Sequence, residues 1–504
     1  MCVGLIEMAH ARTAGVVLSG VAGSLVDVEV DISAGLPSVG VVGLPDTSVA
    51  EARWRVRSAF ASIGATWPAQ RVTVSLAPAE VRKLGAGLDL PIAIAILKAS
   101  EQLPEVNLER TVFVGELGLD GHLRAVRGAL AGVLAARRDD RVIVPVSSLP
   151  EIGADARVSG ASTLAQVVHI LRGSEPGERA CERPSVHREH PDLADVRGHH
   201  VARHCLEVAA AGGHHLAMVG PPGIGKTLLA ERLTGILPDL TEEAERDVAV
   251  IHALAGRAPR GSAPPFESPH HSASTSALIG TVAGARVTPG AFTLAHHGVL
   301  FLDEAPEFAR PALEALRQPL ESGVVSLHRS GWVGSLPSAF QLVLAANPCP
   351  CGMRGESECS CAPTAIRRYA ARLSGPLMDR IDVRVSLHRP LDAELRDPTP
   401  AESSATVRAR VEQARERAVR RFRGAPWQVN ARIPAGELRT RFLPDASGTD
   451  VLDEVERTSR NLRSPDRILR VAWTIADLGG RDRPSGDDIA RALGLRGAAT
   501  AWAA

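Results

Sequence analysis

Lysine is nearly absent from this 504-residue chain. Its three lysines are Lys83, Lys98 and Lys226, and arginine supplies the rest of the positive charge. Arginine's planar fork suits bidentate pairing, whereas the lysine ammonium is a compact charge on a flexible stem. A lysine retained in such a chain therefore indicates a position where the geometry needs an ammonium.

Net charge and long apolar runs are also lacking. The 57 lysines and arginines balance 57 acidic residues, so the basic excess of many DNA-binding proteins is absent, and any contact with nucleic acid must come from a local patch or a pore. Apolar runs such as residues 90–97 and 299–302 are far shorter than the ~20 residues that a membrane-spanning helix needs. We expect no membrane span.

Cysteine is sparse but clustered. Of seven cysteines, four lie close together, at Cys349, Cys351, Cys359 and Cys361. This spacing is typical of a metal site rather than of a distributed disulfide framework, and it favours a reducing cytoplasm. Four thiolates suffice for a closed, structural Zn²⁺ site; reduced free thiols or a redox pair are the alternatives.

One stretch carries clear phosphate-binding chemistry. Residues 220–227 match GxxxxGK[ST], in which backbone N–H groups surround the phosphates of a nucleotide. A strand over 215–219 and a helix over 228–237 would flank this loop. The sequence therefore predicts ATP binding with Mg²⁺, through Gly220, Pro221, Pro222, Gly223, Ile224, Gly225, Lys226, Thr227 and Leu228.

Two later apolar runs end in polar residues. Residues 299–302 end in Asp303 and Glu304, as expected for a buried strand that delivers carboxylates to its C-terminal edge. Asp303 would hold Mg²⁺ together with Thr227, and Glu304 would polarise the attacking water. Residues 341–346 end in Asn347, which is placed to reach the γ-phosphate or the water.

Three arginines are candidates for contact with the nucleotide. Arg380 could act as an arginine finger in a neighbouring subunit; a surface salt bridge with an adjacent aspartate is the alternative. Arg467 and Arg470 lie three apart on one helical face, and we favour Arg467 as the one that reaches back to the nucleotide. Exposed arginines on an amphipathic helix are the alternative there.

Composition divides the chain into four parts. Residues 1–172 alternate strand-like and helical runs, and residues 173–195 are a polar linker. Residues 196–400 carry the nucleotide motifs, and residues 401–504 are helical, with Pro465 at the first position of one helix and Gly479-Gly480 at its end. We expect an α/β protein that ends in a small helical lid.

The motifs together resemble the ComM/YifB family of magnesium-chelatase-like AAA+ ATPases. Besides the phosphate loop, the segments that carry the resemblance are GLPD at 43–46, EAR at 51–53, DLPIA at 89–93, VGEL at 114–117, DVRG at 195–198, PHHSAS at 269–274, LAHHGVLFLDE at 294–304, NPCPCG at 347–352 and DRILRVA at 466–472. The resemblance implies an N-terminal α+β domain like the Lon protease domain (ribosomal S5 domain 2-like), a P-loop AAA+ αβα core and an α-helical lid.

The resemblance also implies a function. It implies a homohexameric ring in the cytoplasm that hydrolyses ATP and drives branch migration on DNA during recombination or the integration of transforming DNA. It places a hairpin at residues 323–340 near the ring's pore, where His328 and Arg329 would meet phosphates; an ordinary solvated hairpin is the alternative. Asp89 and Leu130 stand where the Lon family places its serine and lysine, so we expect no peptidase activity.

Several functional alternatives stay open at this point. A protein-remodelling ATPase and a magnesium-chelatase motor share the same core. Residues 366–423 hold fourteen arginines against eight acids, and this excess would face either DNA or intramolecular ion pairs. The pairs His270-His271 and His296-His297 lack the spacing of metal ligands on a helix, so we interpret them as loop structure or nucleotide-coupled contacts.

Overall fold

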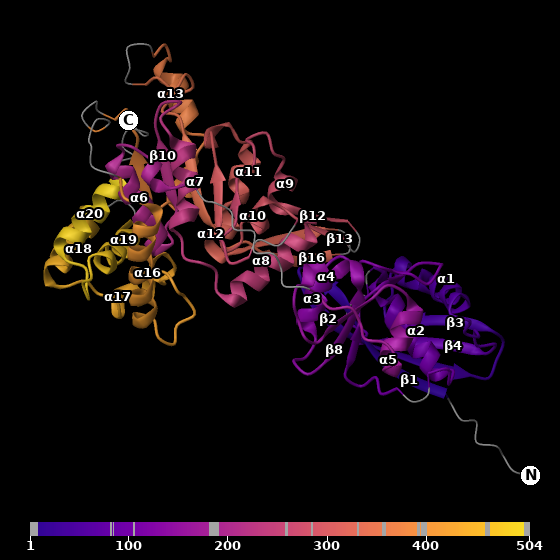
Figure 1. Ribbon diagram of the computed structural model, residues 1–504. Coiled ribbons are helices and arrows are strands. Elements are labelled where there is room, and N and C mark those ends of the chain that lie inside the picture. The colour runs from indigo at the N-terminus through magenta and orange to yellow at the C-terminus, as the bar shows by residue number, and fades with distance from the viewer. Residues whose placement is uncertain are drawn as a thin grey trace, which may run out of the picture.

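The computed structural model describes residues 9–80, 83, 85–103, 106–180, 191–257, 261–283, 286–329, 332–354, 359–390, 394, 401–458 and 464–497 (Figure 1). The front domain and the helical lid lie at opposite ends of the molecule, with the nucleotide-motif core between them. None of the helices in these ranges combines the length and the apolar character needed to cross a bilayer.

The front domain is built on one seven-stranded sheet, in the order β3-β4-β2-β1-β5-β8-β9. β1 and β2 form a long antiparallel hairpin, and β1, β5, β8 and β9 run parallel to one another. Strands and helices alternate along residues 9–172, as the strand-like and helical runs of this part of the sequence predict. The elements are β1 (Ala9–Ser19), β2 (Ala22–Ser33), β3 (Ser38–Val42), α1 (Thr47–Ser62), β4 (Arg71–Ala77), α2 (Asp89–Ala99), β5 (Thr111–Phe113), β6 (Glu116–Leu117), β7 (Leu123–Arg124), α3 (Ala129–Ala135), β8 (Arg141–Pro145), α4 (Leu149–Ile152), β9 (Val158–Ala161) and α5 (Leu164–Arg172).

The core is a five-stranded parallel sheet in the order β11-β14-β17-β10-β18. This arrangement is consistent with a P-loop AAA+ core, because the strand that feeds the phosphate loop, β10, lies between two strands that come later in the chain. The elements are α6 (His200–Gly212), β10 (Leu216–Val219), α7 (Lys226–Ile236), α8 (Glu242–Leu254), β11 (Phe266–Glu267), α9 (Thr275–Ile279), β12 (Gly280–Ala283), β13 (Arg286–Pro289), α10 (Ala291–Leu294), β14 (Val299–Leu302), α11 (Arg310–Ala315), α12 (Arg317–Ser322), β15 (Val324–Arg329), β16 (Trp332–Pro337), β17 (Gln341–Ala346), α13 (Pro363–Ala370), α14 (Gly375–Met378) and β18 (Val383–Ser386).

β15 and β16 pair as the hairpin expected at residues 323–340. The side chains of His328 and Arg329, which were predicted to meet phosphates, lie outside the described residues. The backbone therefore shows the hairpin, and the assignment of these two side chains stays a prediction.

The lid packs directly on the core. Its helices are α16 (Ser404–Arg421), α17 (Ala435–Thr440), α18 (Ala446–Thr458), α19 (Ser464–Leu478) and α20 (Gly486–Gly497). Apolar residues of the lid, such as Val411 and Trp473, share one hydrophobic cluster with Leu206 and Leu229 of the core. Because buried apolar area is the main favourable term in folding, this shared cluster makes the lid and the core one packed unit.

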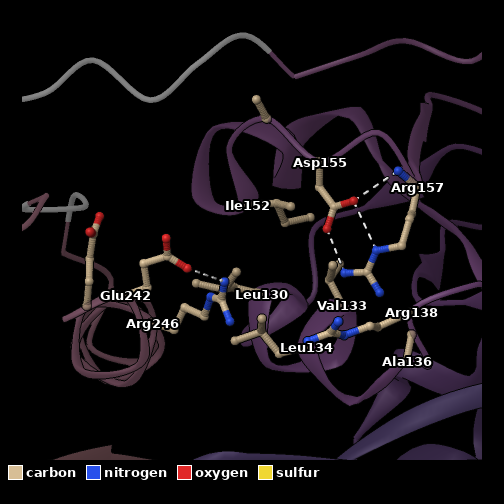
Figure 2. Close-up of a pocket in the computed structure, with 12 residues that line it drawn as sticks. Leu130, Val133, Leu134, Ala136, Arg138, Ile152, Asp155, Arg157, Glu242 and Arg246 are labelled. Carbon is tan, nitrogen blue, oxygen red and sulfur yellow. Dashed lines mark hydrogen bonds and ion pairs between the residues drawn. The ribbon is translucent and has the colours of Figure 1, made fainter.

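The front domain meets the core through α8. Val250 and Leu254 of α8 join a hydrophobic cluster of the front domain that includes Leu130 and Val133. Beside this contact is an open pocket of about 780 Å³ (Figure 2). Two pairs of its charged residues contact each other, Arg157 with Asp155 at 2.7 Å and Arg246 with Glu242 at 3.2 Å, and Arg138 and Glu245 also line the pocket.

Candidate nucleotide site

The phosphate loop joins β10 to α7, as the motif predicts. Gly223 and Gly225 have φ values of +75° and +96°, a backbone conformation that residues with a Cβ rarely adopt. Gly220 is equally restricted, because a Cβ there would lie 2.9 Å from the carbonyl oxygen of Leu387. These glycines let the backbone turn tightly in front of α7, so that its amides face one concave space.

The Lys226 ammonium lies inside this loop. Its Nζ donates to the carbonyl oxygens of Gly220 at 2.7 Å and Pro221 at 2.9 Å, and to Asn347 Oδ1 at 2.9 Å. Burial lowers the pKa of Lys226, and the charges of Asp303 and Glu304 oppose that shift. The retained lysine is thus held where the loop can deliver its charge to phosphates.

Thr227 and Asp303 come together beside the loop. Thr227 Oγ1 donates to Asp303 Oδ2 at 2.7 Å, and the backbone N–H of Glu304 donates to Asp303 Oδ1 at 2.8 Å. A hydroxyl and a carboxylate are hard oxygen ligands of the kind that Mg²⁺ prefers, with phosphate oxygens and waters completing the set. The donor set therefore fits the Mg²⁺ that the sequence predicts at these two residues.

Glu304 follows β14 in a left-handed conformation, with φ at +49°. Its Oε2 lies 3.2 Å from Nδ1 of His271, in the loop after β11. The sequence pattern grouped His271 with the other paired histidines and did not single it out. The contact arises because β11 and β14 are adjacent parallel strands, so residues just beyond their C-terminal ends meet. His271 is positioned to orient the Glu304 carboxylate.

Asn347 lies at the end of β17, next to β10 in the sheet. Its side chain accepts from Lys226, as noted above, and its backbone contacts Tyr369 of α13, the single tyrosine of the chain. Burial raises the pKa of Tyr369 to about 12, and the hydrogen bond from the Asn347 backbone partly offsets that rise. The sequence did not predict this phenol at the site because no motif marks it.

Arg380 does not lie among these groups. Its guanidinium pairs with Glu321 at the end of α12 and donates to the carbonyl oxygen of Pro376 at 2.5 Å. Within the described part of the chain its ion-pair partner is thus Glu321, rather than Asp379 or Asp382. The predicted role of Arg380 as an arginine finger would act on the nucleotide of a neighbouring subunit. Because the structure holds a single chain, that role stays a prediction.

Arg467 belongs to a buried polar network between lid and core. Its Nη1 lies 2.8 Å from Asp382 Oδ1, and His214 Nδ1 lies 3.0 Å from Asp382 Oδ2. His214 Nε2 reaches Thr474 Oγ1 of α19 at 2.8 Å. Although burial alone would raise the pKa of Asp382, the hydrogen bond of His214 and the charge of Arg467 hold it well below its usual range. Arg470 instead donates to the carbonyl oxygen of Ile433, inside the lid, at 2.8 Å.

Replacing Arg467 with alanine should destabilise the protein, because it leaves the Asp382 carboxylate buried with less compensation. We expect a loss of about 3 kcal/mol, seen as an apparent melting temperature lower by roughly 5–10 °C. Arg420→Ala is the control, since Arg420 pairs with Glu416 on the exposed surface of α16 and should change stability by less than about 0.5 kcal/mol. Equal melting temperatures for the two variants would contradict the assignment of Arg467 to this network.

Most of the arginine-rich stretch is paired within the chain. Arg408 meets Asp239 and Glu412, Arg410 meets Glu207 and Glu402, and Arg421 meets Asp477, at distances of 2.6 to 2.9 Å. Others bond to carbonyl oxygens, as Arg415 does with Ala210 at 2.6 Å. This pattern favours the ion-pair interpretation of these residues over a DNA-binding face.

The four clustered cysteines lie beside the phosphate loop. Their sulfur atoms are all within 4.8 Å of one another, so the tertiary structure brings together the two CxC pairs whose spacing suggested a metal site. A hydrogen bond from the backbone of Met353 and contacts with the neighbouring thiols lower the pKa of Cys351 to about 6.

Comparison with known proteins places this arrangement in a family. Models of magnesium chelatase, subunit ChlI, match residues 192–395, and related models match residues 28–148 and, for the C-terminal part of that subunit, 401–496. YifB of Escherichia coli (strain K12) is 41% identical over 504 residues, which is 97% of each chain. The chain belongs to the ComM/YifB family of magnesium-chelatase-like AAA+ ATPases.

Other relatives match as completely. An uncharacterized protein of Mycobacterium tuberculosis is 45% identical over 501 residues, 97% of this chain and 99% of the relative. Competence protein ComM of Haemophilus influenzae is 39% identical over 491 residues, 95% of each chain. Family membership agrees with the parallel core sheet and supports an AAA+-type ATPase that uses ATP and Mg²⁺.

Proposed function

We propose that this protein is an Mg²⁺-dependent ATPase that acts as a homohexameric motor on DNA, of the branch-migration type, in recombination or the integration of transforming DNA. The observation that carries the ATPase part is the convergence of Lys226, Thr227, Asp303, Glu304 and Asn347 at one edge of the sheet. The closely spaced thiols favour a reducing cytoplasm as its location.

The chain's own residues divide the work of hydrolysis. Lys226 leaves its carbonyl partners for the phosphates, and Asn347, which accepts a hydrogen bond from its ammonium, holds it at the γ-phosphate end of the loop. Thr227 and Asp303 hold Mg²⁺, which neutralises charge on the phosphates when bound. Glu304, oriented by His271, accepts a hydrogen bond from the attacking water and aligns it.

Assembly supplies the remaining positive charge. Arg380 lies in the chain's own α12–α14 region, tied to Glu321, and it would have to change partner when a neighbouring subunit's nucleotide approaches. Charge on the transferring phosphoryl group would then be neutralised across the subunit boundary. Arg467 of the lid pairs with Asp382 of the core, so a movement of the lid relative to the core would change this contact.

We propose that residues 1–172 form a Lon-protease-like domain without peptidase chemistry, followed by a linker at 173–195, the core at 196–400 and the lid at 401–504. Asp89, where that family places its serine, is fully engaged: Arg55 contacts both of its oxygens at 2.6 and 2.9 Å, and the backbone of Leu117 donates at 3.2 Å. Lys83 donates to the carbonyl oxygen of Pro78. Neither side chain is arranged as a nucleophile with its base.

DNA is the proposed substrate because the name of the Haemophilus relative refers to competence and because β15 and β16 form a two-stranded sheet separate from the core sheet, at the position of the expected pore hairpin. The test is unwinding of a labelled forked or four-way DNA junction with ATP and Mg²⁺, alongside Lys226→Ala. Displacement that needs ATP and is lost in the variant supports a DNA motor. Robust hydrolysis without DNA stimulation or displacement would favour protein remodelling or chelatase-like work instead.

A further inference from the structure

The loop between β17 and α13 carries the four cysteines. Cys349 and Cys351 follow Asn347 at the end of β17, and Cys359 and Cys361 precede α13. Cys349 is buried, Cys351 is exposed, and Cys359 and Cys361 are half-buried. Two short CxC segments from the two ends of one loop are therefore brought to a single point.

The distances between the sulfur atoms match one ion at their centre. Sγ of Cys349 lies 3.3 Å from Cys351 and 3.9 Å from Cys359, and Cys351 lies 3.7 Å from Cys359. Zn–S bonds of about 2.3 Å in a tetrahedron separate the sulfurs by about 3.8 Å. A disulfide would need about 2.05 Å. We propose that these four thiolates bind one structural Zn²⁺ ion, and that this ion holds the loop against the phosphate-binding loop.

The ligand chemistry selects the class of metal. Four thiolates are soft ligands, which favour zinc over the hard cations Mg²⁺ and Ca²⁺. Sulfurs this close leave room for a single ion rather than for an iron–sulfur cluster. With all four positions filled by protein, the site has no open position for a substrate, so its role is structural.

The same loop contacts the nucleotide machinery at two places. Gly352, one residue after Cys351, has φ at +81°, and a Cβ there would lie 2.6 Å from Cδ of Pro222 in the phosphate loop. Asn347, two residues before Cys349, accepts the hydrogen bond from Lys226. Loss of zinc would release this loop. The phosphate loop would then lose the packing of Gly352 on Pro222, and Lys226 would lose Asn347 as a fixed hydrogen-bond partner.

The effect on nucleotide rests on the proposed ATPase function, whereas the metal site does not. Zinc content is therefore measured by mass spectrometry on the full chain, without nucleotide or DNA. We expect about one zinc per chain, and far less in Cys361→Ser. Cys205→Ala is the matched control, since Cys205 is buried in α6, far along the chain from the cluster, and its substitution should keep the metal. A Cys361→Ser protein that keeps full zinc, or an unaltered protein that takes up none from added zinc, would overturn the site.

A second measurement tests the coupling and guards against misfolding of the variant. Zinc is withdrawn from the unaltered protein with a chelator and then restored, and binding of a fluorescent, non-hydrolysable ATP analogue is titrated in each state. We expect the affinity for the ATP analogue to fall roughly tenfold when zinc is removed, which is the size of effect seen when residues that support the ligands of a site are lost. The affinity should recover when zinc is restored. Unchanged affinity in the zinc-free protein would refute the coupling while leaving the metal site standing. Replacement by Co²⁺ should give the thiolate charge-transfer band of a sulfur-ligated ion.

Discussion

Lys226→Ala should reduce ATP hydrolysis by about 10³-fold or more, because it removes the one cation that the loop presents to the β- and γ-phosphates. The ammonium makes three hydrogen bonds inside the loop, so its loss also leaves the carbonyl oxygens of Gly220 and Pro221 and the amide of Asn347 without a donor. Nucleotide affinity should fall together with turnover. Phosphate release and titration with a fluorescent ATP analogue measure the two effects separately.

Lys98→Ala is the control for this substitution. Lys98 lies in α2 of the front domain, outside the core that carries the phosphate loop, and its replacement should leave hydrolysis within about a factor of two of the unaltered rate. Each variant removes one of the chain's three lysines, so the two proteins lose the same charge at different positions. A difference in hydrolysis between them therefore reflects the position of Lys226. Turnover by Lys226→Ala at the level of Lys98→Ala would refute the site.

Glu304→Gln should separate binding from chemistry. The amide keeps the size of the side chain but is a much weaker hydrogen-bond acceptor for the attacking water, so hydrolysis should fall by about 10²–10³-fold while ATP still binds. Lys226, Thr227 and Asp303 keep their contacts, since none of them uses the Glu304 side chain. We expect ATP to accumulate unhydrolysed on the variant, detected as bound, intact nucleotide after gel filtration.

Glu307→Gln is the matched control, three residues further along the chain. Glu307 pairs with Arg372 at 2.9 Å on a half-exposed surface, where loss of an ion pair has little effect. Its hydrolysis rate should stay within about a factor of two of the unaltered rate. If both glutamine variants kept full turnover, the attacking water would be oriented by a different residue, and His271 would be the first to examine.

Local patterns in the sequence predicted the parts of the site that one segment carries. The phosphate loop needs glycines at left-handed positions and a lysine next to a threonine, and all of these lie within residues 220–227. The two buried strands that end at Asp303 and Asn347 were equally visible, because an apolar run followed by polar residues marks the C-terminal edge of a parallel strand. The helix at 464–478 followed from Pro465 near its start and Gly479-Gly480 at its end.

Contacts between distant segments were decided by the tertiary structure. Sequence patterning does not give the order of strands in a sheet, and that order is what brings His271 to Glu304 and Lys226 to Asn347. The network of His214, Asp382, Arg467 and Thr474 joins residues up to 260 positions apart in the bond between His214 and Thr474, with no motif to link them.

The sequence by itself thus determined which residues were candidates for this chemistry: a phosphate loop, Thr227 with Asp303 as the predicted Mg²⁺ pair, Glu304 as the predicted water-orienting acid, and four clustered thiols. The tertiary structure alone decided how that chemistry is coupled, with Arg380 tied to Glu321, Arg467 to Asp382, and the cysteine loop packed through Gly352 on Pro222. The physical reason is that backbone and side-chain preferences act over a few residues, whereas these couplings depend on which surfaces the burial of apolar area brings together.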